Sequence, residues 1–356
     1  MWIENDIFRE DLEFITSRQF IDWKKFENKT VFVTGGTGLI GFYVVNSLLY
    51  YNRTHLNKIN ILALVRNMEK ACYMYKAQLQ NDKKYLKLIK GTVEDLPPIS
   101  QSIDFIIHGA SPTASDFFVD KPVETIQISV LGTWNMLNLA KEKKIKSMIF
   151  LSTMEVYDPI QQREKVSETF PSYLNPMNPR SSYPESKRLC ESLCSSFYFE
   201  YGVPVNCIRL TQTFGPGIAY NDQRLFAFLI RSAIEKKDIV LMTEGKTCRD
   251  YLYLADATTA ILTILSSNEK NETFNAANES TYCSIKEMSE LVADKISNKQ
   301  IRVLVNLDGQ KKTCKFMPEL YMDLDTNKLK KLSWNAQFTL LEMFNRTIQS
   351  LQTNKG

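Results

Sequence analysis

The chain has 356 residues, of which 44% are hydrophobic, so it can bury a full core and is long enough for one large domain with an appended lobe or for two domains. Its 44 basic and 40 acidic side chains leave a formal charge of only +4, which argues against the phosphate-dominated binding of a nucleic-acid protein. Seven cysteines without a Cys-x-x-Cys pair and only two histidines favour neither a disulfide framework, nor a metal site, nor a Ser-His-Asp hydrolase.

The first ten residues carry several acids and no long apolar core, unlike a signal peptide. No stretch elsewhere approaches the roughly 20 apolar residues of a membrane span. We therefore expect no membrane association, and a reducing cytoplasm as the compartment.

The predicted elements begin with an N-terminal extension, residues 1–28, whose apolar side chains recur with helical spacing, and which we interpret as a docking segment. These apolar residues are Phe8, Leu12, Ile15 and Phe20. From Thr30 onward, short apolar strands alternate with longer amphipathic segments, a pattern typical of a parallel sheet covered by helices. We expect strands at residues 31–34, 59–65, 86–89, 105–107, 148–152 and 205–210, and helices at 39–51, 123–144 and 183–201.

The fold class that follows is α/β, with a Rossmann-type doubly wound parallel sheet and a smaller C-terminal α/β substrate lobe. Residues 29–214 should form mainly the dinucleotide-binding domain. The regular alternation breaks after residues 214–217, so residues 215–356 are predicted to form mainly the substrate-binding lobe, with some return to the first domain.

A glycine-rich turn follows the first strand directly and opens the first long helix. Glycines at 35, 38 and 41 allow a tight turn, close approach to a pyrophosphate and close packing of helix on strand. The helix N-terminus adds N–H donors for the phosphates. The residues assigned to the cofactor here are Gly35, Thr37, Gly38, Leu39, Ile40 and Gly41.

The end of the second strand bears on the choice of cofactor. An acidic side chain there would bind the ribose hydroxyls of NAD, whereas an arginine can pair with a 2′-phosphate. The sequence places Arg66 at this point. We predict NADP, with NAD as the alternative in which Arg66 is a solvated surface side chain.

Tyr183 and Lys187 stand four residues apart and share one face of a predicted helix. An ammonium near a phenol favours the phenolate and would turn the tyrosine into an acid/base near neutral pH. The strand at 148–152 leads into Thr153, which can hydrogen-bond a reacting oxygen, and Glu155, an additional acid/base candidate. The alternatives are a strand-end cap for Thr153 and a purely structural carboxylate for Glu155.

Together these residues resemble the extended short-chain dehydrogenase/reductase family of nucleotide-sugar epimerases, dehydratases and decarboxylases, over about residues 29–350. Residues 110–112 (ASP) and the approach PRSSYPESKR at 179–188 are similar to UDP-glucuronate decarboxylases. The resemblance implies a nucleotide-activated sugar as substrate. It places Ala110 at the cofactor, and its implied substrate contacts are Ser111, Thr153, Arg180, Thr213, Arg224 and Arg249.

For two of these arginines a structural role is the alternative. Arg249 could form an ion pair with Asp250 or Asp256, and Arg224 could belong to a solvated helix face. His108, at the end of an apolar strand, is expected to be a packed residue beneath the cofactor rather than a ligand.

The chain also departs from the decarboxylases and 4,6-dehydratases. Met154 stands where they carry a serine or aspartate, and Ser129 where many relatives place an asparagine that braces the catalytic lysine. Relatives dimerise through two long helices, which correspond to residues 123–144 and 183–201, so we expect a homodimer. The apolar seam would use Leu131, Met136, Leu189 and Leu193.

Three functions follow from these patterns. The first is reversible hydride transfer at a sugar carbinol carbon, with epimerisation, dehydration or decarboxylation from the keto intermediate. The second is a net NADPH-dependent reductase of a nucleotide-linked keto-sugar or ketose, giving a deoxysugar or an activated alditol, which Arg66 and Met154 favour. The third, a non-catalytic nucleotide-binding scaffold, is disfavoured by the intact set of Thr153, Tyr183 and Lys187.

Overall fold

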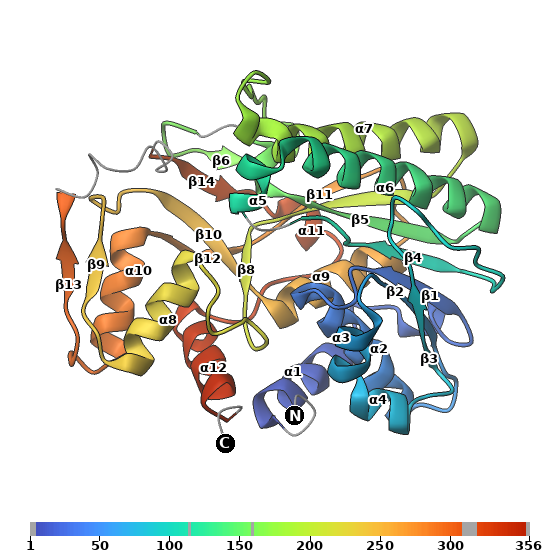
Figure 1. Cartoon of the computed structure of the whole chain (residues 1–356), viewed down its shortest axis with the longest axis horizontal. Coiled ribbons are helices and arrows are strands. Elements are labelled where there is room, and N and C mark those ends of the chain that lie inside the picture. Colours follow the sequence, from blue (N-terminus) through green and yellow to red (C-terminus); the bar gives the residue numbers. More distant parts are fainter. Residues whose placement is uncertain (1–4, 113–114, 158–159, 308–318, 354–356) are drawn as a thin grey trace.

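Seven parallel strands form the largest sheet of the protein (Figure 1). The structure is a computed structural model, and it describes residues 5–112, 115–157, 160–307 and 319–353. The strand order is β11-β7-β5-β4-β1-β2-β3, so the chain runs outward from β1 in both directions. The strands are β1 (Thr30–Thr34), β2 (Asn60–Val65), β3 (Leu86–Lys90), β4 (Phe105–His108), β5 (Ser147–Thr153), β7 (Val205–Leu210) and β11 (Thr273–Ala276). All six predicted strands lie in this sheet, and the predicted doubly wound fold is confirmed.

Helices cover both faces of the sheet, and the strands are therefore apolar on both sides. Val31 and Val33 pack into the core beneath α2 (Leu39–Thr54) and α9 (Leu254–Ser266). Phe32, between them, packs into the opposite core beneath α6 (Pro122–Lys143) and α7 (Ser182–Tyr201). Successive strand residues point to opposite faces, which is why one short run serves two cores.

Backbone chemistry sets the ends of the two long helices. Pro122 stands at the first position of α6, where its missing N–H costs no intrahelical bond. α7 ends at Gly202, whose φ of +70° is readily adopted only without a Cβ.

The N-terminal segment packs against the main core. α1 (Asp6–Thr16) begins at the N-cap Asn5 and buries Phe8, Leu12 and Ile15 against the main core. Its Asp11 is buried and accepts hydrogen bonds from the Tyr43 and Tyr253 hydroxyls, each at 2.8 Å, and pairs with Arg346 at 2.8 Å. Asp11 and its three partners come from α1, α2, β10 (Cys248–Tyr253) and α12 (Leu340–Thr353), so this segment joins the start of the chain to its end.

A second sheet is formed mainly by strands from the later part of the chain. Its order is β12 (Asn278–Ser284), β10 (Cys248–Tyr253), β14 (Tyr321–Leu324), β6 (Lys165–Val166), with β8 (Gln212–Phe214) also alongside β10. β13 (Val303–Val305) pairs with β9 (Ile239–Leu241). The remaining α-helices of the described residues are α3 (Met68–Met74), α4 (Lys76–Asn81), α5 (Ser115–Asp120), α8 (Leu225–Glu235), α10 (Ile285–Leu291), α11 (Asn327–Lys330) and α12 (Leu340–Thr353).

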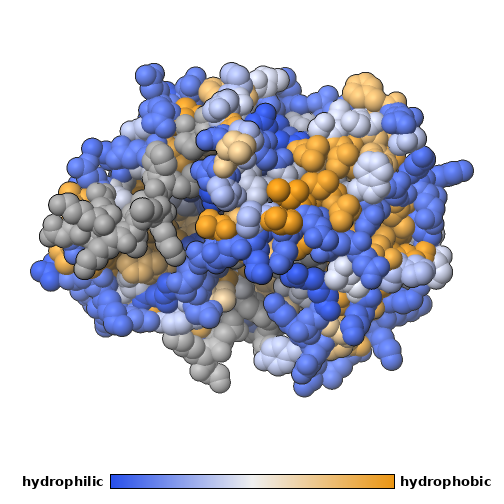
Figure 2. Space-filling view, turned by 45° about the horizontal axis from the view of Figure 1, so that its top comes forward, coloured by the Kyte–Doolittle hydropathy of each residue, from blue (hydrophilic) through white to orange (hydrophobic). Residues whose placement is uncertain are grey.

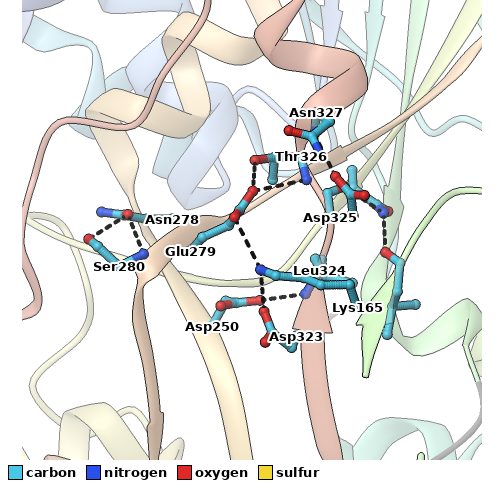
Figure 3. A network of polar contacts seen from close by, with 12 residues as sticks. Lys165, Asp250, Asn278, Glu279, Ser280, Asp323, Leu324, Asp325, Thr326 and Asn327 are labelled. Atoms are coloured by element: carbon cyan, nitrogen blue, oxygen red, sulfur yellow. Dashed lines mark hydrogen bonds and ion pairs between the residues drawn. The ribbon is translucent and has the colours of Figure 1, made fainter. Parts of the chain in front are cut away.

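A polar network ties the strands of this second sheet together (Figure 3). The Lys165 ammonium lies 2.6 Å from Asp323 and 3.1 Å from Glu279, and so joins β6 to β14 and β12. The buried Asp250 carboxylate of β10 accepts the Leu324 N–H at 2.7 Å. Burial raises the pKa of Asp250 to about 8, so this carboxyl is largely protonated near neutral pH.

No helix in the described ranges combines the length and the apolar character that a membrane crossing requires.

Candidate active site

A cavity of about 510 Å³ opens at the carboxyl ends of the parallel strands. This is the crevice in which doubly wound sheets bind their ligands. The predicted site residues that line it are Gly35, Thr37, Gly38, Leu39, Ile40, Gly41, Arg66, Ala110, Ser111, Thr153, Glu155, Tyr183, Lys187, Thr213 and Arg224. Two predicted residues, Arg180 and Arg249, are not part of this lining.

The glycine turn leaves no room for side chains at its tightest points. A Cβ on Gly41 would lie 2.3 Å from the carbonyl oxygen of Gly35, and a Cβ on Gly35, whose φ is +75°, would lie 2.9 Å from the backbone of Gly109. Gly38 is the N-cap of α2 and offers no side chain to the first N–H groups of that helix. These N–H groups are available to an anion, so the turn fits the pyrophosphate of a dinucleotide.

Buried polar contacts tie the ends of β1 and β4 together beneath the cavity. The Thr34 hydroxyl accepts the N–H groups of Gly109 and Ala110 and lies 2.8 Å from His108 Nδ1. His108 is 2% exposed, and its other ring nitrogen lies 3.2 Å from the Thr133 hydroxyl. Burial, with the nearby Lys187 charge, lowers the pKa of His108 to about 3, so this residue is a neutral packed support, as expected.

Arg66 and Lys70 are both exposed and line one end of the cavity. Asn67 accepts the Lys70 N–H at 2.9 Å and so caps α3, which sets Lys70 one turn beyond Arg66. The sequence did not indicate Lys70 as a site residue, because a lysine early in a short surface helix is ordinarily solvated.

Tyr183 and Lys187 line the same cavity from one face of α7. The Lys187 ammonium donates to the Leu151 carbonyl oxygen at 2.7 Å and lies 5.9 Å from the centre of the Tyr183 ring. Burial lowers the pKa of Lys187 to about 8.

The expected lowering of the Tyr183 pKa is wrong for this structure. Burial, followed by the Glu155 charge, raises the pKa of Tyr183 above its ordinary value, and the Thr153 and Arg180 side chains offset this only in part. The physical reason is that desolvation disfavours the phenolate while the Lys187 ammonium is directed at Leu151. The phenol is therefore protonated near neutral pH.

Thr153 and Glu155 reach the cavity from the end of β5. The Thr153 hydroxyl accepts the Glu155 N–H at 3.2 Å and so caps the short 3₁₀ turn Met154–Val156, while its side chain still faces the cavity. The Glu155 carboxylate pairs with Arg180 at 2.6 Å. Met154 is buried, and its sulfur accepts the Thr211 hydroxyl at 3.3 Å, so this position holds no group that could carry a proton.

The predicted substrate arginines differ in their surroundings. Arg224 forms an ion pair with Asp222 at 2.6 Å. Its side chain is about half exposed and lines the cavity. The Nε of Arg249 is buried with no hydrogen-bond partner in the described part of the chain. The Asp250 carboxylate accepts Leu324 N–H instead, and the Asp256 carboxylate accepts Gln337 N–H at 3.0 Å, so neither alternative ion pair for Arg249 is present there.

Ser129 does not take over the bracing role of the family's asparagine. Its hydroxyl lies 3.5 Å from that of Ser111, and its carbonyl oxygen accepts the Cys190 thiol at 3.2 Å. Lys187 is held by Leu151 instead.

The doubly wound sheet, the glycine turn at a helix N-terminus and the Tyr183–Lys187 pair beside it define a Rossmann-type dinucleotide-binding protein. Residues 31–277 match the model of the NAD-dependent epimerase/dehydratase family, and the chain belongs to this family.

Two curated relatives are similar to this chain over about 70% of its length or more. The chain is 28% identical over 244 residues to UDP-glucuronic acid decarboxylase 1 of Xenopus tropicalis, covering 68% of this chain and 55% of that protein. It is 28% identical over 275 residues to UDP-glucuronic acid decarboxylase 6 of Arabidopsis thaliana, covering 76% of this chain and 75% of that protein.

Among solved structures, UDP-glucose 4-epimerase from Thermotoga maritima superposes with a TM-score of 0.74 at 18% identity, covering 92% of this chain and 100% of that chain. A dTDP-glucose 4,6-dehydratase from Bacillus anthracis gives a TM-score of 0.72 at 20% identity, covering 92% and 97% of the two chains. At identities of 18% and 20%, this likeness shows a shared fold and nothing more specific.

Proposed function

We propose that this protein transfers hydride reversibly at a carbinol carbon of a nucleotide-activated sugar, as the opening step of an epimerisation, dehydration or decarboxylation. The observation that carries the proposal is that Thr153, Tyr183 and Lys187 reach the cavity that begins at the glycine turn. The names of the relatives, which are decarboxylases, epimerases and dehydratases of nucleotide sugars, support it.

In this proposal a bound nicotinamide supplies the hydride acceptor and donor. The glycine turn and the start of α2 hold the pyrophosphate. Tyr183 exchanges the proton of the sugar hydroxyl, and Thr153 hydrogen-bonds the same oxygen. Lys187, with a pKa lowered to about 8, is still mostly cationic near neutral pH, and in this scheme its ammonium turns from Leu151 toward the phenolate when that forms. We assign to Glu155 the exchange of a second proton with the keto intermediate.

For the substrate, we assign Ser111, Thr213, Arg224 and Arg249 to the nucleotide diphosphate and sugar. Arg249 is outside the cavity lining, but its buried Nε has no partner in the described residues, and such a donor costs free energy unless a ligand satisfies it. A planar guanidinium also suits a diphosphate. Arg180, which is outside the cavity lining, acts in this scheme through Glu155.

A net reductase is the second candidate, and two observations favour it. Met154 supplies no proton carrier where the dehydratases and decarboxylases have one. Arg66 and Lys70 line the cavity and suit a 2′-phosphate, and therefore NADPH, the reductant that a net reductase consumes.

The test is to incubate the purified protein with UDP-glucuronic acid, UDP-glucose and dTDP-glucose, and with their 4-keto forms, with and without added NADPH, and to identify the products by mass. Turnover without net consumption of cofactor selects the epimerase-type reaction, and stoichiometric loss of NADPH selects the reductase. A protein that binds cofactor and converts none of these sugars would contradict both.

We propose NADP as the cofactor of this NAD(P)-binding site, because Arg66 and Lys70, which are close in sequence at the start of α3, both line the cavity and supply two cations there. Arg66→Ala is expected to weaken NADP(H) binding by roughly 1.5–3 kcal/mol, the range for a charged hydrogen bond, and to leave NAD(H) binding nearly unchanged. Titration of both cofactors by calorimetry measures this. Equal weakening of the two would refute the pairing of Arg66 with a 2′-phosphate.

We propose that the protein is a homodimer joined through α6 and α7. Hydrophobic surface gathers on the face that these helices occupy (Figure 2), and its exposed residues are Val123, Ile126, Leu131, Trp134, Leu189, Phe199 and Tyr201. Of the seam residues predicted from sequence, Leu131 and Leu189 are about half exposed and Leu193 is partly buried. Met136 was wrong as a seam residue, because it faces the sheet and is fully buried in the core.

Light scattering at micromolar concentration is expected to give twice the chain mass, and Leu131→Glu with Leu189→Glu is expected to give the single mass, because two charges would be buried in the seam. A parent protein that elutes and scatters as a monomer would refute the assembly.

We further propose the cytoplasm as the compartment. The six cysteines in the described ranges, Cys72, Cys190, Cys194, Cys207, Cys248 and Cys283, are free thiols, which suits a reducing environment.

A further inference from the structure

The ring of Phe118 lies flat against the ring of Tyr183. Their centroids are 4.1 Å apart and their planes differ by 5°. Phe118 belongs to α5, and the Ser182 hydroxyl donates to its carbonyl oxygen at 3.2 Å, which fastens α5 to the residue just before Tyr183. Phe118 is 2% exposed and Tyr183 8% exposed, so the stack excludes water from one face of the phenol.

Arg180 packs beside Phe118 as well. Its guanidinium carbon lies 5.1 Å from the centre of the Phe118 ring, and its Nη2 donates to Glu155 at 2.6 Å. The Arg180 N–H donates to the Asn178 side chain at 3.0 Å, which sets the 3₁₀ turn Pro179–Ser181 ahead of α7. Glu155 in turn gives its own N–H to Thr153. A continuous set of contacts therefore runs from Thr153 through Glu155, Arg180 and Phe118 to Tyr183.

We propose that Phe118 is a positioning residue for Tyr183, and that the Arg180–Glu155 ion pair holds the Phe118 ring in place. The inference rests on the proposed role of Tyr183 as the acid/base. A flat partner restricts the phenol ring to its own plane and keeps the hydroxyl on the side of the cavity where Thr153 lies. A displacement of a reacting group by about 1 Å can cost about 100-fold in rate, so this restriction has a kinetic consequence.

Phe118 also lines the cavity and could instead serve only as packing in its wall, and the two roles call for different side chains. Filling the space needs an apolar group of similar volume, which leucine supplies. Holding a phenol flat needs an aromatic ring, which tyrosine supplies and leucine does not.

The experiment compares Phe118→Leu and Phe118→Tyr with a matched control, Phe26→Leu. Phe26 is fully buried and contacts the ring of Phe105 at a centroid distance of 4.9 Å, and it is absent from the cavity lining. For each variant we would measure the melting temperature, the affinity for NAD(P)H, and kcat and KM with the nucleotide sugar that the parent protein converts among UDP-glucuronic acid, UDP-glucose and dTDP-glucose and their 4-keto forms.

Phe118→Leu is expected to lower kcat by about 10- to 100-fold, with the KM and the cofactor affinity little changed. Phe118→Tyr should restore most of the parent kcat. Phe26→Leu should lower the melting temperature and leave the kcat of the folded protein unchanged. If Phe118 had only a structural role, Phe118→Leu would behave like Phe26→Leu and would lower the melting temperature without lowering the kcat of the folded protein.

Phe118→Leu with the parent kcat, or Phe118→Tyr as slow as Phe118→Leu, would overturn the positioning role. A Tyr183→Phe arm separates this failure from failure of the proposed function. If Tyr183→Phe is slow while Phe118→Leu retains the parent kcat, only the positioning role is wrong. If Tyr183→Phe has the parent rate, or the parent protein converts none of the sugars, the proposed function fails and the positioning role fails with it.

Discussion

Tyr183→Phe is expected to slow the hydride step by about 10²–10⁴-fold, the usual contribution of a general acid/base. The substitution removes one oxygen and leaves a ring that can still stack on Phe118, 4.1 Å away in the parent protein. The glycine turn is untouched. We therefore expect the cofactor affinity and the melting temperature to stay close to those of the parent.

Single-turnover measurement of nicotinamide absorbance checks this expectation. Lys187→Met should cause a similar loss of rate and should also weaken cofactor binding, since the family resemblance places this lysine at the nicotinamide ribose. The two losses should not add in the double variant, because each substitution disables the same proton transfer. Hydride transfer at the parent rate in Tyr183→Phe would mean that the active site lies elsewhere.

Gly41→Ala is expected to abolish most of the cofactor affinity. The new Cβ would lie 2.3 Å from the carbonyl oxygen and 2.8 Å from the carbonyl carbon of Gly35, which are backbone atoms that cannot swing away. The turn must open or the start of α2 must move, and either change displaces the N–H groups that face the cavity. Strain from overpacking typically costs about 1–3 kcal/mol. If this strain reduces the free energy of cofactor binding, the Kd rises by roughly 5- to 150-fold.

Gly36→Ala is the matched control within the same turn. A Cβ there would meet the Cβ of Ala63 at 3.4 Å and the Tyr75 hydroxyl at 3.6 Å, which are ordinary contacts. We expect this variant to bind NAD(P)H nearly as the parent does, and calorimetric titration measures both. Parent-like affinity in Gly41→Ala would show that the turn tolerates a side chain where the geometry forbids one.

The sequence by itself determined the parallel sheet and its cofactor turn, because their signals are local. The six strands follow from short, mostly apolar runs, as strands covered by helices on both faces require. The glycines at 35, 38 and 41 follow directly after such a run, and the turn they form involves only neighbouring residues. The spacing of Tyr183 and Lys187 likewise places both on one helix face, whatever the rest of the fold does.

Contacts between separate elements were decided only by the tertiary structure. Nothing along the chain indicates that Arg180 pairs with Glu155, or that Phe118 covers Tyr183, because the first two are 25 positions apart in sequence and each partner comes from a different element. The return of β11 to the large sheet depends on how the chain folds back after residue 215. Met136 faces the core because of the rotation of α6 on the sheet, which helical spacing alone does not specify.

The ionisation of the site depends on the tertiary structure most of all. Spacing along α7 predicts that Lys187 lowers the pKa of Tyr183, yet burial raises it and the ammonium is directed at Leu151. A pKa depends on desolvation and on the direction of each charge, and both are set by every element that packs around the group. Sequence spacing identifies which groups can interact, and packing decides the balance between them.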